Sequence, residues 1–156
     1  MDESAEQLQE ALAERGVTVA SAESLTGGAV AELLSEVPGS SGTFRGGVVA
    51  YTSEVKMRLL GVSEHTVSAA GVVSAQCARE MASGAAELFD AAYAVSTTGV
   101  AGPERQEGKP VGLVYVAVHG PAGVEAFEHR LSGDRARIRA ETCRLALRHL
   151  LAAVGG

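Results

Sequence analysis

The sequence lacks the features that mark several classes of protein. It has only two cysteines, Cys77 and Cys143, and no Cys-x-x-Cys pair, so neither a disulfide framework nor a structural zinc site is predicted. Its four histidines are widely spaced and form no His-x-x-x-His pair, which argues against metal catalysis. Without a Gly-x-Gly-x-x-Gly motif or a complete P-loop, dinucleotide and nucleoside triphosphate binding are unsupported. No apolar run approaches the ~18 residues of a membrane span, and the N-terminus has no signal-peptide pattern.

Positive charge is also scarce. The chain has 13 Lys+Arg against 19 Asp+Glu, a formal net charge of −6, which excludes a general nucleic-acid surface and attachment to anionic membranes. The distribution is uneven, because residues 130–156 carry six arginines against Asp134 and Glu141. We therefore expect a cytoplasmic protein with no nucleic-acid or membrane partner, whose basic C-terminal segment can hold a small anion.

The hydrophobic content is large enough for a packed core. With 156 residues, of which 46% are hydrophobic, the chain fits one domain over 1–156. Helical periodicity alternates with short apolar segments that are typical of strands. Helices are expected at 5–15, 26–37, 53–61, 74–89 and 134–152, and strands at 17–20, 47–51, 91–97, 111–118 and 124–131. The last two strands are joined by the hairpin His119–Gly123, so the sheet is mixed. The predicted fold is a three-layer α/β/α domain.

Serines at three positions are predicted to begin helices. Ser53, Ser63 and Ser74 each precede a segment with a helical pattern, and a serine hydroxyl there accepts a backbone N–H of the first turn. Within 74–89 the spacing places Cys77, Met81, Ala85 and Leu88 on one face, which we expect to be buried.

The segment Ala22–Gly28 (AESLTGG) is the first candidate for chemistry. It joins an expected strand to an expected helix, and ligands of open α/β sheets gather at the carboxyl ends of strands. Ser24 would lie beside free helix N–H groups that suit an oxyanion or a phosphate, while Gly27 and Gly28 leave room for a ligand near the backbone. A second interpretation stays open, in which Ser24 or Thr26 is only the helix N-cap.

Tyr51 and Lys56 form the second candidate. A lysine acts as the base for a serine nucleophile when desolvation keeps it neutral, and a neighbouring tyrosine can relay the proton. The alternative is an exposed lysine on a solvated helix. Ser53 and Lys56 also match Ser-x-x-Lys of penicillin-recognising enzymes, but the partner motifs of those enzymes are missing, so Ser53 is interpreted as an N-cap.

Two further segments complete the candidate site. Thr98, Gly99 and Gly102 lie in a glycine-containing loop that follows the expected strand 91–97. In the last helix, Arg135 and Arg139 point away from the stripe of Arg137, Arg144 and Arg148, which we interpret as a solvated face. Arg135 and Arg139 are therefore candidates for holding a phosphate, with an ion pair to an acidic residue as the alternative.

Taken together, these segments resemble the C-terminal domain of the competence/damage-inducible protein CinA, whose stand-alone members are nicotinamide-nucleotide amidases. The resemblance runs from about residue 5 to 152 and implies a layered α/β fold. It rests on AESLTGG at 22–28, Tyr51-x4-Lys56, Gly61-Val62, GVVS at 71–74, TGVAGP at 98–103, KPVG at 109–112 and SGDR at 132–135.

The resemblance implies a reaction and assigns roles to residues. The reaction is hydrolysis of the carboxamide of nicotinamide mononucleotide (NMN), which gives the nicotinate nucleotide and ammonia. Ser24 matches the family's proposed nucleophile, Lys56 its base and Tyr51 an assisting residue. The oxyanion would be held by N–H groups near Leu25–Gly28 or Gly99–Gly102.

Substrate recognition follows from the same resemblance. Thr26, Gly27, Gly28, Thr98, Gly99 and Gly102 would line the substrate site, and Arg135, with Arg139, would bind the phosphate. No metal or organic cofactor is needed. The expected partner is a phosphorylated pyridine nucleotide, and the alanine-rich helices favour a homodimer or a higher homo-oligomer.

Three positions depart from the family pattern. Leu25 stands where cysteine is usual, Ser53 replaces a common asparagine, and the loop 103–108 lacks the usual glycine pair after proline. Members without detectable amidase activity exist, so two other functions stay open. One is a non-catalytic nucleotide-binding domain that regulates partners, and the other is a serine amidase acting on a different amide.

Overall fold

The computed structural model describes residues 2–156, in which helices and strands alternate as the sequence predicts. The helices are α1 (Glu3–Arg15), α2 (Ala29–Glu36), α3 (Ser53–Leu60), α4 (Glu64–Ala69), α5 (Ala75–Phe89) and α6 (Arg135–Gly155), with a 3-10 turn at Ser40–Gly42. The strands are β1 (Val19–Glu23), β2 (Phe44–Val49), β3 (Tyr93–Gly99), β4 (Leu113–Gly120) and β5 (Gly123–Arg130).

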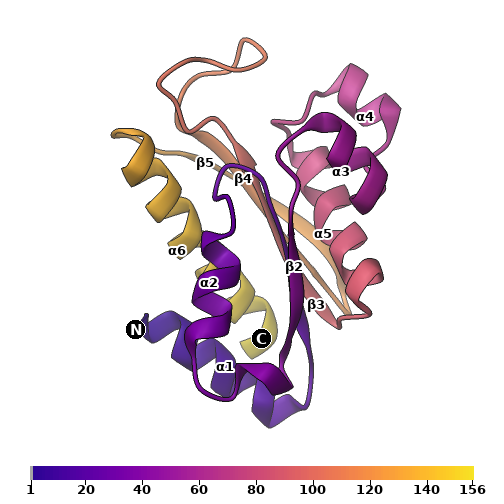
Figure 1. Ribbon diagram of the computed structural model, residues 1–156, viewed down its shortest axis with the longest axis vertical. Coiled ribbons are helices and arrows are strands. Elements are labelled where there is room, and N and C mark those ends of the chain that lie inside the picture. Colours follow the sequence, from indigo (N-terminus) through magenta and orange to yellow (C-terminus); the bar gives the residue numbers. More distant parts are fainter. Residues whose placement is uncertain (1) are drawn as a thin grey trace.

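The strands form a five-stranded mixed sheet in the order β2-β1-β3-β4-β5. β1 lies parallel to both β2 and β3. Helix α2 connects β1 to β2 and helices α3–α5 connect β2 to β3, as helical crossovers between parallel strands do. The hairpin adds β4 antiparallel to β3, and β5 antiparallel to β4 at the edge of the sheet. Helices α1, α2 and α6 cover one face of the sheet and α3, α4 and α5 the other (Figure 1). The predicted three-layer α/β/α fold is confirmed.

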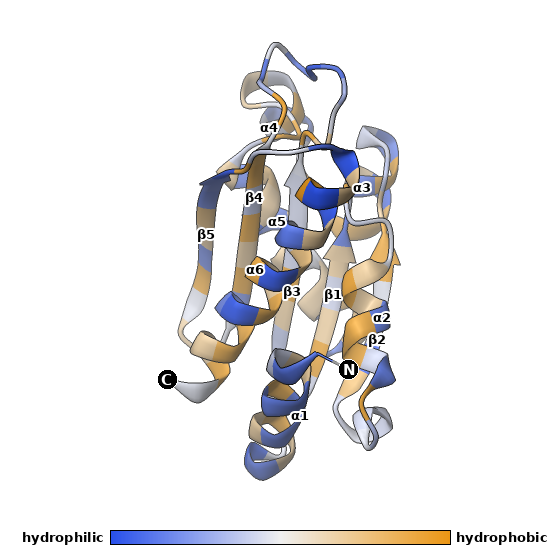
Figure 2. Cartoon of the chain, turned by 90° about the vertical axis from the view of Figure 1, so that its left-hand side faces the viewer, coloured by the Kyte–Doolittle hydropathy of each residue, from blue (hydrophilic) through white to orange (hydrophobic). Residues whose placement is uncertain are grey.

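Apolar side chains fill both spaces between the sheet and its helices. On one face Leu8 and Leu12 of α1 pack with Leu147 and Leu150 of α6. On the other face Met81 of α5 packs on small strand residues such as alanine. The strands are accordingly hydrophobic along the middle of the molecule, whereas the helices carry their polar side chains on the outside (Figure 2). The high alanine content thus reflects close packing of helix on sheet.

β1 runs through Glu23, three residues beyond the predicted end of the strand. All five of its residues are buried, since a central strand between two helical layers is covered on both faces. Its polar residues Ser21 and Glu23 obscured this in the sequence. The Glu23 carboxylate accepts hydrogen bonds from the N–H groups of Val30 (2.8 Å) and Ala31 (3.0 Å) in the first turn of α2, which satisfies a charge that would otherwise be costly to bury.

Helix starts were predicted correctly at two of the three serines. Ser63 and Ser74 are the N-caps of α4 and α5. The prediction for Ser53 is wrong, because Thr52 is the N-cap and its hydroxyl accepts the N–H of Val55. Threonine fills this position as well as serine does, so pattern alone placed the start one residue late.

Two other predictions for the helices are wrong. α2 begins at Ala29 after a Gly28 N-cap with no side-chain cap, so the interpretation of Ser24 or Thr26 as its N-cap is wrong. Glu23 satisfies the helix N–H groups in their place. In α5, Leu88 is 49% exposed rather than buried, since the sheet does not cover that position near the helix end.

The carboxyl ends of β1, β2 and β3 meet at one edge of the sheet. The loops that follow them, the segment 100–112 and the first turn of α6 gather there, at the top of Figure 1. This is the edge at which ligands of open α/β sheets bind. Across residues 2–156, no helix combines the length and apolar character needed to cross a membrane.

Candidate active site

Ser24 follows β1 directly and is held in a short turn before α2. Its N–H donates to the carbonyl of Thr97 at the end of β3 (3.0 Å), and its own carbonyl accepts from Gly27 (3.0 Å). Because Glu23 fixes the start of α2, the strand, turn and helix together present the half-buried Ser24 hydroxyl at the sheet edge. A nucleophile on a strand-to-helix turn is a known solution for exposing a reactive hydroxyl.

Lys56 reaches this hydroxyl from α3. Its side chain is only 1% exposed, and Nζ lies 3.0 Å from Ser24 Oγ and 2.7 Å from the carbonyl oxygen of Ala50. The Thr52 cap sets the start of α3, so that Lys56 falls on the face of the helix turned toward the sheet. The interpretation of Lys56 as an exposed surface lysine is therefore wrong.

The surroundings of Lys56 favour its neutral form. Burial lowers the pKa of Lys56 below the ordinary value for lysine, while smaller electrostatic effects of Cys77 and Glu107 raise it. Within residues 2–156, no carboxylate forms an ion pair with Nζ. A neutral amine has two N–H groups and one lone pair, so it can donate to the Ala50 carbonyl and accept the Ser24 proton at once. This is the arrangement that a serine nucleophile with a lysine base requires.

Ser24 opens into a cavity of about 290 Å³. Besides Ser24 its walls are Leu25, Tyr51, Arg135 and the segment 99–106, so the predicted residues Gly99 and Gly102 line it. Its arginines and backbone groups make the cavity polar, which suits a charged ligand.

Arg135 ties together two walls of the cavity. Its Nη1 donates to the carbonyl of Gly102 (2.8 Å) and its Nη2 to the hydroxyl of Tyr51 (2.8 Å). The proton-relay geometry predicted for Tyr51 is absent, since both hydrogen bonds of the Lys56 amine go to other groups. Tyr51 is 56% exposed and lies at the rim, because it follows the edge strand β2 and no helix covers it.

Arg139 lies behind the cavity rather than in it. Its Nε donates to the carbonyl of Leu25 (2.9 Å) and its Nη2 to that of Thr26 (3.2 Å). A Cβ on Gly27, whose φ is +59°, would lie 3.2 Å from this guanidinium. Arg139 thus fixes the turn that carries Ser24, and the structure does not bring it to the wall where a phosphate would bind.

The remaining predicted substrate-binding residues also lie outside the cavity wall. The buried hydroxyls of Thr26 and Thr97 hydrogen-bond to each other (2.8 Å), and Thr98 donates to the carbonyl of Val72 (2.7 Å). Gly28 is the N-cap of α2. These residues shape the loops, whereas the cavity itself is lined by their neighbours.

Residues of two kinds at this site were not predicted from the sequence. No role was predicted for Glu23, although it directly precedes Ser24 in the sequence. Glu104, Arg105 and Gln106 line the cavity, but they stand in a loop that departs from the family pattern and so carried no signal.

A second, larger cavity of about 680 Å³ lies at the opposite end of the sheet, between α6 and the β4–β5 hairpin. The ring of His149 on its wall stacks on Phe127 with centroids 3.8 Å apart. The Nε2 atoms of His149 and His129 lie 2.8 Å apart, a contact that sequence spacing does not reveal. The contact between a serine hydroxyl and a buried lysine is at the smaller cavity, which is therefore the candidate active site.

Comparison with known proteins places the chain in a family. A sequence profile of the CinA C-terminal domain matches residues 1–154. The chain belongs to the CinA C-terminal domain family. This CinA domain is 49% identical, over 82% of its length, to a CinA-like protein of Frankia casuarinae, and 47% identical, over 94%, to a putative competence-damage inducible protein of Desulforamulus reducens. It spans 30% and 36% of those two chains, about a third of their length.

Solved structures of the family share the fold of the CinA domain. A CinA superfamily protein from Klebsiella pneumoniae has a TM-score of 0.94 at 32% identity, with 98% of this chain and 96% of that chain covered. The competence/damage inducible protein CihA from Agrobacterium tumefaciens has a TM-score of 0.89 at 38% identity, with 100% and 98% covered. Within residues 2–156, the CinA domain has no cluster of three or more His, Cys, Asp or Glu side chains that could hold a metal ion.

Proposed function

We propose that this CinA domain is an amidase that hydrolyses the carboxamide of nicotinamide mononucleotide. The observation that carries the proposal is the contact of 3.0 Å between Lys56 Nζ and Ser24 Oγ at the cavity wall. A buried lysine with a lowered pKa is a suitable base for a serine. The identity of the amide comes from the resemblance of the motifs, and Arg135 in the cavity suits the phosphate of a nucleotide.

The reaction runs in two steps through an acyl-enzyme. Neutral Lys56 takes the proton of Ser24 as Oγ attacks the amide carbon, and the carbonyl oxygen becomes an oxyanion. When the tetrahedral intermediate collapses, the Lys56 ammonium protonates the amide nitrogen, the carbon–nitrogen bond breaks and ammonia leaves. Lys56, neutral again, then takes a proton from water, whose oxygen attacks the ester. Cleavage releases the nicotinate nucleotide and returns the proton to Ser24.

Backbone N–H groups beside Ser24 can hold the oxyanion. The N–H of Leu25 has no hydrogen-bond partner among residues 2–156, and Leu25 lines the cavity. Donation by the residue after the nucleophile is the arrangement used by other serine hydrolases. Of the two loops considered from sequence, the proposal therefore favours the one at Leu25.

The phosphate is proposed to bind at the outer part of the cavity. Arg135 uses one N–H of each terminal nitrogen for Gly102 and Tyr51, which leaves its other donors for a ligand. Arg105 lies on the same wall. Two guanidinium groups at one cavity suit an anionic substrate.

The decisive experiment measures ammonia release from NMN by the wild type and by Ser24→Ala and Lys56→Met. We expect turnover that falls by about 10³-fold or more in both variants, since nucleophile and base act as one unit. Ser53→Ala is the matched control, because it removes the other serine near Lys56 and should keep wild-type activity.

Three other outcomes would contradict parts of the proposal. Loss of activity in Ser53→Ala but not in Ser24→Ala would restore the Ser-x-x-Lys interpretation. Binding of NMN without ammonia release would indicate a non-catalytic, regulatory domain. Turnover of a different amide alone would keep the Ser24–Lys56 chemistry and refute the substrate.

A further inference from the structure

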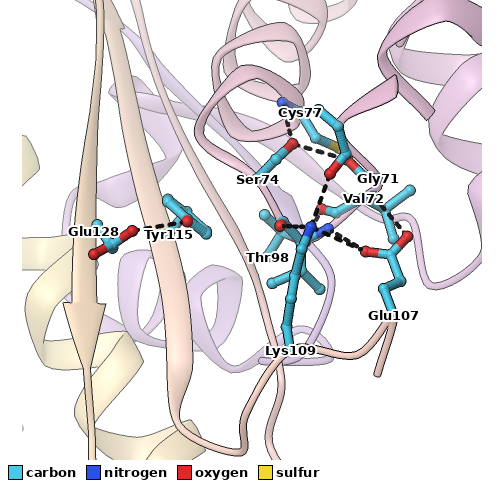
Figure 3. Close-up of polar contacts among 11 residues, drawn as sticks. Gly71, Val72, Ser74, Cys77, Thr98, Glu107, Lys109, Tyr115 and Glu128 are labelled. Carbon is cyan, nitrogen blue, oxygen red and sulfur yellow. Dashed lines mark hydrogen bonds and ion pairs between the residues drawn. The ribbon is translucent and has the colours of Figure 1, made fainter. Parts of the chain in front are cut away.

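Two side chains hold the segment 100–112, which supplies much of the cavity wall, against the stretch of chain between α4 and α5. The Glu107 carboxylate accepts the N–H groups of Val72 and Val73, both at 3.0 Å. Lys109 Nζ donates to the carbonyls of Ala70 (2.8 Å) and Val73 (2.5 Å) and lies 3.5 Å from the Glu107 carboxylate. Figure 3 shows Glu107 and Lys109 converging on this stretch of backbone. We call these contacts the Glu107 latch.

The backbone that receives the latch has a conformation that suits it. Gly71 has a φ of +80°, and a Cβ there would lie 2.6 Å from a Glu107 oxygen, so the carboxylate requires glycine at this position. Ser74 donates to the carbonyl of Gly71 (2.8 Å) and Thr98 to that of Val72 (2.7 Å), and both contacts are visible in Figure 3. The GVVS motif, whose role the sequence left open, thus supplies the backbone N–H groups that bind the Glu107 carboxylate.

The latch and Arg135 hold opposite ends of the same wall. Residues 103–106 line the cavity. Arg135 binds the carbonyl of Gly102 just before them, and Glu107 is fixed just after them. We propose that Glu107 is a positioning residue of the proposed amidase. It holds residues 103–106 against the cavity, although its own carboxylate binds the backbone that precedes α5. This inference rests on the proposed function.

The Glu107 latch also places the Glu107 carboxylate where its charge affects the pKa of Lys56. The groups that act electrostatically on Lys56 are Cys77 of α5 and Glu107 of the loop. Burial raises the pKa of the Cys77 thiol to about 11, so the thiol is largely neutral up to pH 10. Although partial burial opposes it, the N–H groups of Val73 and Val72 and the Lys109 ammonium lower the pKa of Glu107. Glu107 is therefore the charged group, and its removal should lower the pKa of Lys56 further.

The test compares Glu107→Ala, Glu107→Gln and, as a control, Glu54→Gln, which removes an exposed carboxylate two residues before Lys56 on α3. In Glu107→Ala we expect amide exchange at Val72 and Val73 to become about 10-fold faster or more, because bonds to a charged acceptor are lost. KM for NMN should rise several-fold more than kcat falls. In Glu107→Gln the acid limb of kcat/KM should move to lower pH, because a charge that raises the pKa of Lys56 is removed, while Glu54→Gln matches the wild type in every assay.

The inference and the proposed function can fail separately. Unchanged exchange at Val72 and Val73 in Glu107→Ala refutes the latch whatever the activity is. Faster exchange with unchanged KM and an unmoved acid limb also overturns the inference, since Glu107 is then structural only. If the wild type releases no ammonia, the proposed function fails, and NMN binding decides the inference: weaker binding by Glu107→Ala than by Glu54→Gln upholds it, and equal binding refutes it.

Discussion

Replacing Glu23 by glutamine should destabilise the protein strongly, although the two side chains have nearly the same shape. Glu23 is 1% exposed, and both of its oxygens accept N–H groups from the first turn of α2. Glutamine keeps one acceptor and turns an NH₂ group toward the other N–H. The variant therefore leaves a buried donor unsatisfied and removes a negative charge from a helix N-terminus.

These two losses set the magnitude. An unsatisfied buried donor costs about 1–3 kcal/mol, and loss of the charge–dipole interaction adds roughly 0.3–2 kcal/mol. We expect the free energy of unfolding of Glu23→Gln to fall by about 2–4 kcal/mol. With a urea m-value of about 2 kcal/mol per M, the unfolding midpoint falls by roughly 1–2 M.

Urea unfolding followed by circular dichroism measures this midpoint. Glu32→Gln is the matched control, because Glu32 also lies in the first turn of α2 but is exposed, and its change should stay within about 0.5 kcal/mol. A loss below 1 kcal/mol in Glu23→Gln, or equal losses in the two variants, would refute the role given to the buried carboxylate.

Three other predictions concern the base, the phosphate and the histidine pair. Because burial lowers the pKa of Lys56, kcat/KM for NMN should rise with pH through a midpoint below 10.5, and a flat profile from pH 6 to 10 would count against Lys56 as the base. Arg135→Ala should raise KM for the nucleotide about 10-fold or more beyond its effect on the phosphate-free riboside. Arg137→Ala, at an exposed position of the same helix, should leave both KM values unchanged, and equal effects of Arg135→Ala on both substrates would contradict the assignment. Burial and Arg148 lower the pKa of His129, while burial, His129 and Arg148 lower that of His149. The unfolded chain therefore binds more protons than the folded protein at acidic pH. Because of this difference, the free energy of unfolding should fall as pH falls below about 6.5. In His149→Phe the loss of unfolding free energy between pH 7.5 and pH 5 should be smaller than in the wild type, and an equal loss would show that the pair does not titrate as described.

The sequence by itself determined the features that depend on near neighbours in the chain. Helical periodicity located α5 and α6 to within a few residues, and the caps at Ser63 and Ser74 follow from hydroxyls beside the N–H groups they accept. The exposed stripe of Arg137, Arg144 and Arg148 also follows from 100° per residue. Each of these depends on contacts within one or two turns of helix.

Only the tertiary structure decided which candidate residues contact one another and which of them line the cavity. Ser24 and Lys56 are 32 positions apart in sequence, and Tyr51 and Arg135 are 84 apart. No local pattern shows that one arginine faces the cavity while Arg139, one helical turn later, holds the backbone behind it. The burial of Lys56 is likewise a property of the assembled sheet and helices, because desolvation is produced by elements that meet only in the fold. The sequence therefore identified the candidate side chains, and the packing of helices on the sheet determined which of them come into contact.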